Sequence, residues 1–389
     1  MYAQLTTGAK TRVISKISKE SSAVFVELGL DTRKNKAIKS KERRELWEDE
    51  NTGEEIPHGL KISTVMKAKY QRGKQSVFQY LRMTSIVNPH ATISLIVRDR
   101  DGEVIEEAKW IRTSERLPRV VEEIKPHPHG IQLGTLQRML RESEEKRMTS
   151  FLRHNFSGVS MRAAKELLSV SEIEEARNPK RINSEDAKKL IDAFQKIKLL
   201  PPPTDCLSPI DDLLIKKGLS KAIDSRFAST VTRLPTVSQG NPFQIEVGLV
   251  FGGDLSADGP IEVLRFANRV PLMYQQGGCA LTKAIESINW KQYGLDHPGG
   301  KGLPKGAAAV LIHLASTNVQ FTSEAKEAVS DNEEVTAEIR KGLLEVGRGL
   351  KNHLKKNTQR KKAREKFELV NVILPCLLYT SPSPRDPIG

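Results

Sequence analysis

The sequence predicts an α+β chain built from several domains, and three observations lead to this fold class. The chain has 389 residues, a length that suggests two or three domains at roughly 100–200 residues each. Runs that alternate apolar and polar residues fill the first ~115 residues, as antiparallel strands do. Residues 131–200 instead place apolar side chains at helical spacing, and residues 204–330 mix both patterns. We therefore expect a sheet layer, a helical module and a second layer of strands and helices.

The first ~115 residues predict an antiparallel sheet with little helix. A charged stretch at 34–55 ends in a turn at 51–55, and the motif DRDG forms a turn at 99–102. A short helix at 75–84 would place Val77, Tyr80 and Leu81 on one face. The strands expected are 11–18, 23–32, 61–68, 92–99 and 103–110.

Prolines in 116–130 predict a linker, after which the helical module begins. Ser160 is placed to cap a helix that follows Gly158, and another helix starts near Asn183. Three prolines at 201–203 end the module. The apolar residues at helical spacing are Leu133, Leu136, Met139, Leu140, Met148, Phe151, Leu152, Phe156, Ala163, Ala164, Leu167, Leu168, Leu190, Ile191, Phe194 and Ile197.

The last third of the chain predicts a sheet covered by helices. Strands are expected at 242–252 and 260–269, joined as a hairpin through 252–259, with a helix at 280–288. The almost continuous apolar run 307–316 predicts a strand covered on both faces. A long helix follows, with Ser330 and Glu333 as a capping box. Its apolar stripe ends at Leu354, and the basic segment beyond it, towards Lys366, should project into solvent. The stripe consists of Ile339, Leu343, Val346, Leu350 and Leu354.

Composition excludes several classes of protein. Hydrophobic residues make up 38% of the chain and charged residues 28%, which is enough for packed cores and excludes wholesale disorder. No run approaches the ~18 apolar residues of a membrane span, so we expect no membrane partner. The three cysteines, Cys206, Cys279 and Cys376, lie far apart without CxxC spacing. This distribution excludes a disulfide scaffold and favours a reducing, cytoplasmic location.

A net charge of +14 favours a polyanionic partner, for which double-stranded DNA is the first candidate. Two basic clusters could neutralise phosphates, although each could equally be a solvated surface. The first lies in the helical module and contains Arg138, Arg141, Lys146, Arg147, Arg153, Arg162 and Lys165. The second lies on the projecting helix and contains Lys351, Lys355, Lys356, Arg360, Lys361, Lys362 and Arg364.

Other motifs have plainer explanations. His127 and His129 could hold a metal ion, but without a third ligand nearby they are better explained as linker structure, and we expect no metal site. The glycine-rich segments 252–259 and 297–306 match neither phosphate-binding pattern and are interpreted as loops. Trp290, Lys291 and Tyr293 could stack on DNA or simply pack the domain.

Several long blocks, in uninterrupted order over about 2–366, resemble the B subunit of archaeal DNA topoisomerase VI, a type IIB topoisomerase. They are HPHG, NFSGVSMRAAKEL, PPTDCLSPI, NPFQIEVGLVFGG, LRFANRVPLMYQQGGCALTKA, INWKQYG and HLASTNVQFTSEAKEAV. The resemblance implies the C-terminal part of a GHKL ATP-binding domain at 1–118 and a linker with a helix-two-turns-helix domain at 119–203. It also implies a transducer α/β sandwich with a long stalk helix at 204–370.

The resemblance also implies a function. In this family two B subunits clamp together on binding ATP and Mg²⁺, and two A subunits cut one DNA duplex so that a second can pass. The general base and the other ATP-site motifs are expected upstream of Tyr2, so this fragment has no catalytic residue and should bind ATP weakly or not at all. The role at the γ-phosphate is carried over to Lys326, while Asn318 stands at a position where many members have lysine.

The family's WKxY motif, associated with DNA contact, corresponds to Trp290, Lys291 and Tyr293. With Arg162, Lys165, Lys355, Lys356, Arg360 and Lys361, these residues form the expected DNA-binding set. Residues 376–389 look like a translated sequencing adapter and are excluded from the fold prediction. Two rival hypotheses remain: a non-enzymatic DNA-binding or scaffold protein derived from the topoisomerase, and an ATPase of the mismatch-repair or chaperone type. The helical module at 127–203 argues against the second.

Overall fold

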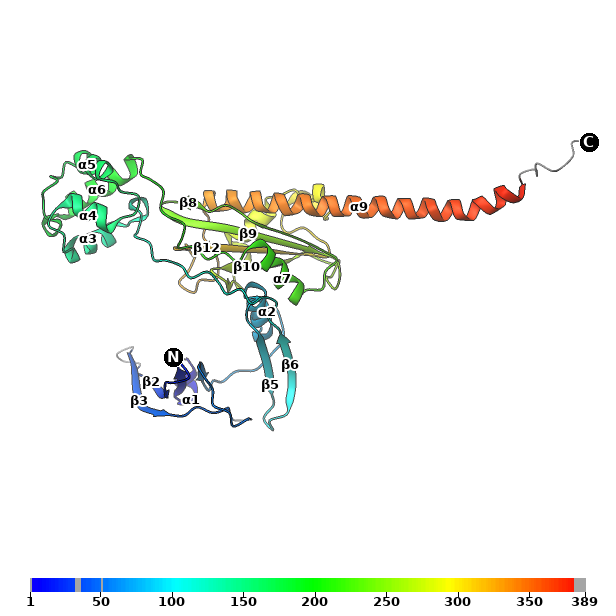
Figure 1. Ribbon diagram of the computed structural model, residues 1–389, viewed down its shortest axis with the longest axis horizontal. Helices are drawn as coiled ribbons and strands as arrows, with labels where there is room; N and C mark the ends of the chain where they lie inside the picture. Colours follow the sequence, from blue (N-terminus) through cyan, green and yellow to red (C-terminus); the bar gives the residue numbers. More distant parts are fainter. Residues whose placement is uncertain (1, 32–35, 50–51, 381–389) are drawn as a thin grey trace, which may run out of the picture. The chain divides into compact units, whose positions relative to one another are not determined.

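The chain folds as two compact units, Met1–Gln71 and Arg72–Gly389. The computed structural model describes residues 2–31, 36–49 and 52–380 (Figure 1). Within these ranges no helix combines the length and the apolar character needed to cross a lipid bilayer.

The first unit contains a four-stranded antiparallel sheet in the order β3-β2-β1-β4. The predicted strands at 11–18 and 23–32 are present in slightly shorter form. The strand predicted at 61–68 instead lies at Gly59–Ser63, so the prediction placed it too far along the chain. Strand β3 was not predicted, because its sequence KAIKSKERRE is almost wholly charged. It lies at the sheet edge, where charged side chains prevent pairing with other chains. The elements are α1 (Tyr2–Thr7), β1 (Thr11–Lys16), β2 (Ala23–Asp31), β3 (Lys36–Glu45) and β4 (Gly59–Ser63).

The second unit begins with helix α2 (Val77–Val87) and the hairpin of β5 (Ile93–Arg98) and β6 (Val104–Trp110). The predicted hairpin is confirmed, but the predicted helix face is wrong. Val77 and Tyr80 are 55% and 42% exposed, while the C-terminal end of α2 buries Met83, Ile86 and Val87.

That buried end of α2 packs on α7 (Asp212–Ala222), a helix that the sequence pattern did not reveal. The helices approach closely at Gly218, where an added Cβ would lie 1.9 Å from the Ile86 carbonyl oxygen. The first predicted domain therefore spans two compact units, with α2 and the hairpin in the second.

The helical module contains the predicted helices, which surround one apolar core. Ser160 caps α5 by accepting a hydrogen bond from the Ala163 N–H, and Asn183 caps α6 through the Asp186 N–H. The predicted starts of both helices are thus confirmed. The four helices are α3 (Leu133–Glu142), α4 (Met148–Asn155), α5 (Met161–Val170) and α6 (Ser184–Lys196).

A six-stranded sheet forms the centre of the second unit, in the order β11-β10-β12-β9-β7, with β8 paired to β9. The prediction of a β9–β10 hairpin is wrong, because β12 lies between these strands, antiparallel to β9 and parallel to β10. All nine residues of β12 are buried, as predicted. The strands are β7 (Phe227–Thr232), β8 (Thr236–Ser238), β9 (Asn241–Phe251), β10 (Glu262–Ala267), β11 (Val270–Pro271) and β12 (Ala308–Ser316).

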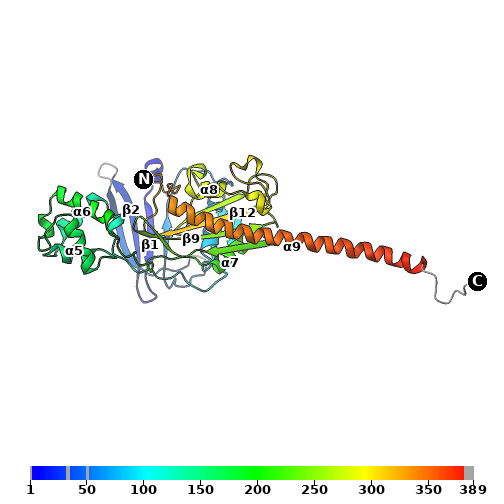
Figure 2. The same cartoon turned by 90° about the horizontal axis from the view of Figure 1, so that it is seen from above.

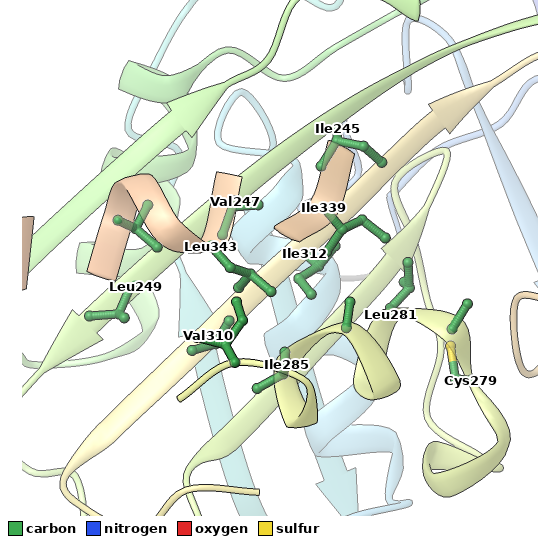
Figure 3. Packing of buried hydrophobic residues seen from close by; sticks show 14 of the residues in the cluster. Ile245, Val247, Leu249, Cys279, Leu281, Ile285, Val310, Ile312, Ile339 and Leu343 are labelled. Carbon is green, nitrogen blue, oxygen red and sulfur yellow. The ribbon is translucent and has the colours of Figure 1, made fainter. Parts of the chain in front are cut away.

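Helices cover both faces of this sheet. Val310 and Ile312 of β12 point towards α8 (Ala280–Glu286) and α9 (Glu333–Thr380), where they meet Ile285, Ile339 and Leu343 (Figure 3). The intervening residues of β12 pack on the opposite face with α7 and α2. Side chains alternate across a strand, so the continuous apolar run of β12 supplies both cores.

Helix α9 is longer than predicted and has a different cap. Asn332, rather than Ser330, accepts a hydrogen bond from the Val335 N–H at 3.0 Å, so the predicted capping box is wrong. The predicted apolar stripe packs on the sheet, and the basic segment after Leu354 is exposed, as expected (Figure 2). The helix continues to Thr380, past the predicted end near 366–370. Residues 381–389 of the adapter-like tail lie outside the described residues.

Candidate functional site

Residues 317–332, here called the switch loop, connect the buried strand β12 to the start of α9. Two backbone interactions close its outer part: a bridge between Phe321 and Val329, and a hydrogen bond from the Thr322 N–H to the Ala328 carbonyl oxygen at 2.9 Å. A loop held at both ends in this way can pass a displacement to the first turn of α9.

The structure separates the two phosphate candidates within the switch loop. Asn318 is exposed at its base, and its N–H donates to the Ser316 hydroxyl at 3.3 Å. Lys326 is exposed near the tip, at a left-handed φ of 56°. Such a backbone conformation is uncommon for lysine and often marks functional loops. No hydrogen bond or ion pair within the described chain holds the Lys326 ammonium group, which leaves it available to an anion.

The WKxY segment lies mainly in the core, which corrects one prediction. Trp290 is fully buried and donates its indole N–H to the Ile285 carbonyl oxygen at 2.8 Å, and Tyr293 is 7% exposed. Their rings meet edge to face with centroids 6.0 Å apart. Two rings held there cannot stack on DNA bases. Lys291 is exposed between them, so it alone in this trio is presented to a ligand.

These two rings also support α9. A Cβ added at Gly347 of α9 would lie 3.0 Å from the Tyr293 ring. The aromatic pair therefore fixes where α9 crosses the domain, and it holds Lys291 close to the point at which α9 leaves the sheet.

The exposed part of α9 carries the densest positive charge. Residues 351–366 contain eight basic side chains and one glutamate. Residues 355–374 are all exposed. Of the basic residues predicted here to bind DNA, Lys361 pairs with Glu365 at 3.9 Å, where the lysine is 81% exposed. Such a pair is weak in water. Lys355, Lys356 and Arg360 have no ion pair within the described part of the chain and can meet phosphates.

In the helical module, Arg162 and Lys165 lie in the first half of α5 and are exposed. Lys165 lies 3.7 Å from Glu175, a separation that gives only weak pairing at the surface. Gly158 sets the entry to α5 at a φ of 72°, and a Cβ there would lie 2.2 Å from the Leu200 carbonyl oxygen. The turn therefore requires glycine.

The histidine pair closes the helical module and shows no sign of a metal site. The His127 Nε2 lies 3.0 Å from the Leu200 carbonyl oxygen, and the His129 Nε2 lies 3.3 Å from that of Ile197. Burial lowers the pKa of His127, so the ring is neutral near pH 7. Within the described residues, no three acidic, histidine or cysteine side chains gather as metal ligands would.

A buried polar network in the sheet was missed by sequence reasoning. Glu246 on β9 and His313 on β12 are both fully buried, and the His313 Nδ1 lies 2.8 Å from the Glu246 Oε2. Glu246 also accepts hydrogen bonds from the N–H groups of Ile210 and Asp211 and from the Thr232 hydroxyl. The signal was visible in the sequence as one glutamate and one histidine inside otherwise apolar strands.

Arg269 extends this network to α2. Its backbone N–H donates to the His313 Nε2 at 3.0 Å. Its guanidinium donates to the carbonyl oxygens of Val87 and Pro209 at 2.8 and 3.0 Å. Burial alone would raise the pKa of Glu246, but His313 and the two N–H groups outweigh it and hold the pKa below its usual value. Glu246 is therefore a carboxylate that joins β9 to β7, to β12 and to the segment before α7.

The comparisons with known proteins agree with this architecture. The family model of the topoisomerase VI B subunit transducer matches residues 202–366. The B subunit of type 2 DNA topoisomerase 6 from Methanococcoides burtonii is 45% identical over 376 residues, which cover 96% of this chain and 58% of the relative. The chain thus spans little more than half the length of several curated relatives that it matches.

A more distant relative is covered more fully. The B subunit of type 2 DNA topoisomerase 6 from Thermococcus sibiricus is 33% identical over 401 residues, covering 91% of this chain and 68% of that protein. A solved topoisomerase IV ATP-binding domain of Francisella tularensis has 10% identity and a TM-score of 0.31, a likeness too weak to inform the fold. On the strength of the sequence relatives and the transducer match, the chain belongs to the family of type 2 DNA topoisomerase 6 B subunits.

Proposed function

We propose that the protein acts as the B subunit of a type IIB DNA topoisomerase, an ATP-dependent isomerase of A2B2 composition. ATP binding and hydrolysis would close a clamp of two B subunits. Closure would drive one DNA duplex through a double-strand break made by the A subunit, which relaxes supercoils and decatenates DNA. The observation that carries this proposal is the switch loop, which connects a strand at the centre of the transducer directly to a projecting helix.

The switch loop offers a physical route for this coupling. The buried strand β12 is fixed by neighbours on both edges and both faces, whereas the Lys326 ammonium group is free. A γ-phosphate that attracts Lys326 would therefore move the loop and the first turn of α9, because β12 cannot follow. ATP and Mg²⁺ are the proposed cofactors of the A2B2 complex, and we expect weak or no binding by this chain alone.

Family membership supports a finer assignment of the parts. Residues 1–118 would be the C-terminal part of a GHKL ATP-binding domain, 119–203 the linker with a helix-two-turns-helix domain, and 204–370 the transducer with its stalk helix. The cytoplasm is the compartment expected for such a protein. The adapter-derived origin of 376–389 stays a hypothesis.

DNA would be held by two basic surfaces of the second unit. The first consists of Lys291 with the exposed basic side chains of α9, and the second of Arg162 and Lys165. Each phosphate neutralised releases condensed counterions, so binding should weaken steeply as salt rises. Duplex binding by the purified chain that is insensitive to salt would contradict this proposal.

A chimera tests the coupling directly. Residues 2–374 would replace the matching region of the Methanococcoides burtonii relative, which would be paired with that organism's A subunit. We expect ATP-dependent relaxation of supercoiled plasmid, and its loss on Lys326→Ala. The variant Asn318→Ala distinguishes the two candidate positions, since we expect it to retain most of the activity. Loss on Asn318→Ala with retention on Lys326→Ala would reverse the assignment.

The scaffold hypothesis is not favoured, because 45% identity extends across nearly the whole chain rather than over the DNA-binding segments alone. It predicts that the chimera binds DNA but never relaxes it, with or without ATP. The mismatch-repair or chaperone alternative is opposed by the helical module between the two sheet-containing parts.

A further inference from the structure

A cavity of about 220 Å³ opens where five chain segments meet in the second unit, and we call it the junction cavity. Its walls come from the residues after α2, the connector before the helical module, the start of α7, the end of β7 and the β10–β11 turn. The lining residues used below are His90, Arg116, Arg119, Asp211 and Arg269.

Two of the three arginines around the junction cavity have a carboxylate partner. Three arginines line it, whereas Asp211 is the one carboxylate among its described lining residues. That carboxylate is already engaged: it accepts from Arg116 at 3.1 Å and caps α7 through the Leu213 N–H. Arg119 is held by Asp205 at 2.9 Å, outside the lining. Arg116 and Arg119 are therefore each paired with a carboxylate, and Arg269 is the arginine of the lining without an ion pair in the described chain.

Arg269 is more costly to bury than the other two arginines, which are mostly exposed. Its guanidinium is held by two carbonyl oxygens, and no carboxylate of the described chain pairs with it within ion-pair distance. Burial lowers the pKa of Arg269, partly offset by the buried Glu246. A cation in such a place is stabilised by an anion nearby.

The same contacts fix Arg269 in position. His313 holds its N–H, the end of α2 and Pro209 hold its guanidinium, and Glu246 orients His313. His90 adds a further polar group. Burial first, and then the charges of Arg269 and Lys221, lower the pKa of His90, so its ring is neutral and retains one N–H donor.

We propose that the junction cavity binds a small phosphate-type anion of the size of phosphate or pyrophosphate. Guanidinium groups donate two parallel hydrogen bonds to phosphate oxygens, which suits a site lined by arginines from separate segments. The volume is below the roughly 300–1,000 Å³ of pockets for drug-sized ligands, which favours phosphate or pyrophosphate over a whole nucleotide. Binding would tie the connector, through Arg116 and Arg119, to the sheet. This inference does not rest on the proposed function.

Calorimetric titration of pyrophosphate into the full 389-residue chain at low ionic strength tests the proposal. The double variant Arg116→Gln/Arg119→Gln should bind about tenfold more weakly or worse, because it loses charge-assisted hydrogen bonds. Both side chains are mostly exposed, so the variant should fold. Arg100→Gln/Arg340→Gln removes the same charge elsewhere and should bind within about twofold of wild type.

Two further measurements locate the anion. Lys326→Gln should leave pyrophosphate affinity unchanged, and hydrogen exchange in the connector 111–125 should slow when pyrophosphate is added. The proposal is overturned if no saturable binding occurs or if both double variants bind alike. It is equally overturned if Lys326→Gln abolishes binding, which would place the anion at the switch loop.

Discussion

The first half of α9, from Glu333 to Leu354, packs against the six-stranded sheet, whereas the second half, from Lys355 to Leu374, is exposed throughout. Both halves belong to one uninterrupted helix (Figure 1). In the first, glycines allow close approach, as at Gly342, where a Cβ would lie 2.8 Å from Val247. In the second, residues 355–366 are mostly basic, and the largely apolar residues 367–374 are exposed rather than packed. The difference suggests that stability resides in the packed half and DNA binding in the exposed half.

The largest effect that tests this division is expected from Leu343→Ala. The Leu343 side chain is fully buried in the core formed with β9, β12 and α8. Its truncation should lower the free energy of unfolding of the second unit by about 2–5 kcal/mol. Leu369→Ala makes the same change in the exposed half, where Leu369 is 59% exposed, and should cost no more than about 0.5 kcal/mol. Urea unfolding measures both. Equal losses would show that the exposed half also packs on something within the chain.

The opposite pattern is expected for DNA affinity, which should depend on the exposed half of α9. Replacing Lys355, Lys356, Arg360 and Lys361 by glutamine should weaken duplex binding at least about tenfold at low salt. If all four contact phosphates, the slope of log K against log salt should become shallower by about 3.6, at about 0.9 per phosphate contact. Stability should hardly change. Lys10, Lys19, Lys67 and Lys69, all exposed in the first unit, supply a control with the same loss of charge. If the control weakens binding equally, net charge rather than this helix explains the affinity.

The neighbouring pair Trp290 and Lys291 repeats the comparison on a smaller scale. Trp290→Phe removes the donor to the Ile285 carbonyl oxygen, so it should cost about 1–3 kcal/mol of stability with no direct change in DNA affinity. Lys291→Gln should instead lower DNA affinity a few-fold and leave stability unchanged. Thermal unfolding and filter binding report the two quantities. Loss of DNA affinity in a fully folded Trp290→Phe protein would restore the expected role of the tryptophan in DNA contact.

Local patterns in the sequence predicted most of the second unit. Helical spacing identified the module around Phe151 and Phe194, and cap residues such as Ser160 gave starts that the structure confirms. The apolar run of β12 predicted burial on both faces, because a strand alternates sides and only a covered one can be apolar throughout. These features depend on a few consecutive residues, which is why they were visible.

Features that depend on distant partners were not predictable. The insertion of β12 between β9 and β10 is a matter of topology, and the charged edge strand β3 lacks the usual strand pattern. The buried face of α2 depends on α7, a partner far along the chain. For the site, exposed lysines such as Lys326 and Lys355 could be identified by type. Packing of Trp290 in the domain was one of the two alternatives that the residues left open, whereas its expected DNA contact came from the family resemblance. The Glu246–His313–Arg269 network could not be predicted, because it forms only where β9, β12 and the β10–β11 turn come together in the fold.

The smallest expected effect comes from ion pairs of α9. The free energy of unfolding should depend on pH through Glu338 in the packed half but not through Glu368 in the exposed half. Burial alone would raise the pKa of Glu338, but hydrogen bonds from Lys341 and Arg233 outweigh it and hold the pKa below its usual value. A lowered carboxyl pKa stabilises the fold above the unfolded value of about 4.3, and this contribution is lost as the pH falls through the folded value. Glu368 pairs with Arg364 at 2.9 Å in the exposed half, where it is 60% exposed.

Glu338→Gln should therefore lower the free energy of unfolding by about 1 kcal/mol at pH 7. The gap to wild type should narrow as the pH falls below the unfolded value of about 4.3, and it should close once the pH is below the lowered pKa of folded Glu338. Glu368→Gln should show no measurable change at any pH, because an exposed pair of this kind contributes little. Urea unfolding at a series of pH values measures both variants. A gap for Glu338→Gln that stays constant with pH would mean that the glutamate acts by packing. A pH-dependent gap for Glu368→Gln would mean that the exposed half contributes electrostatically to the fold, and the division between the halves would no longer hold.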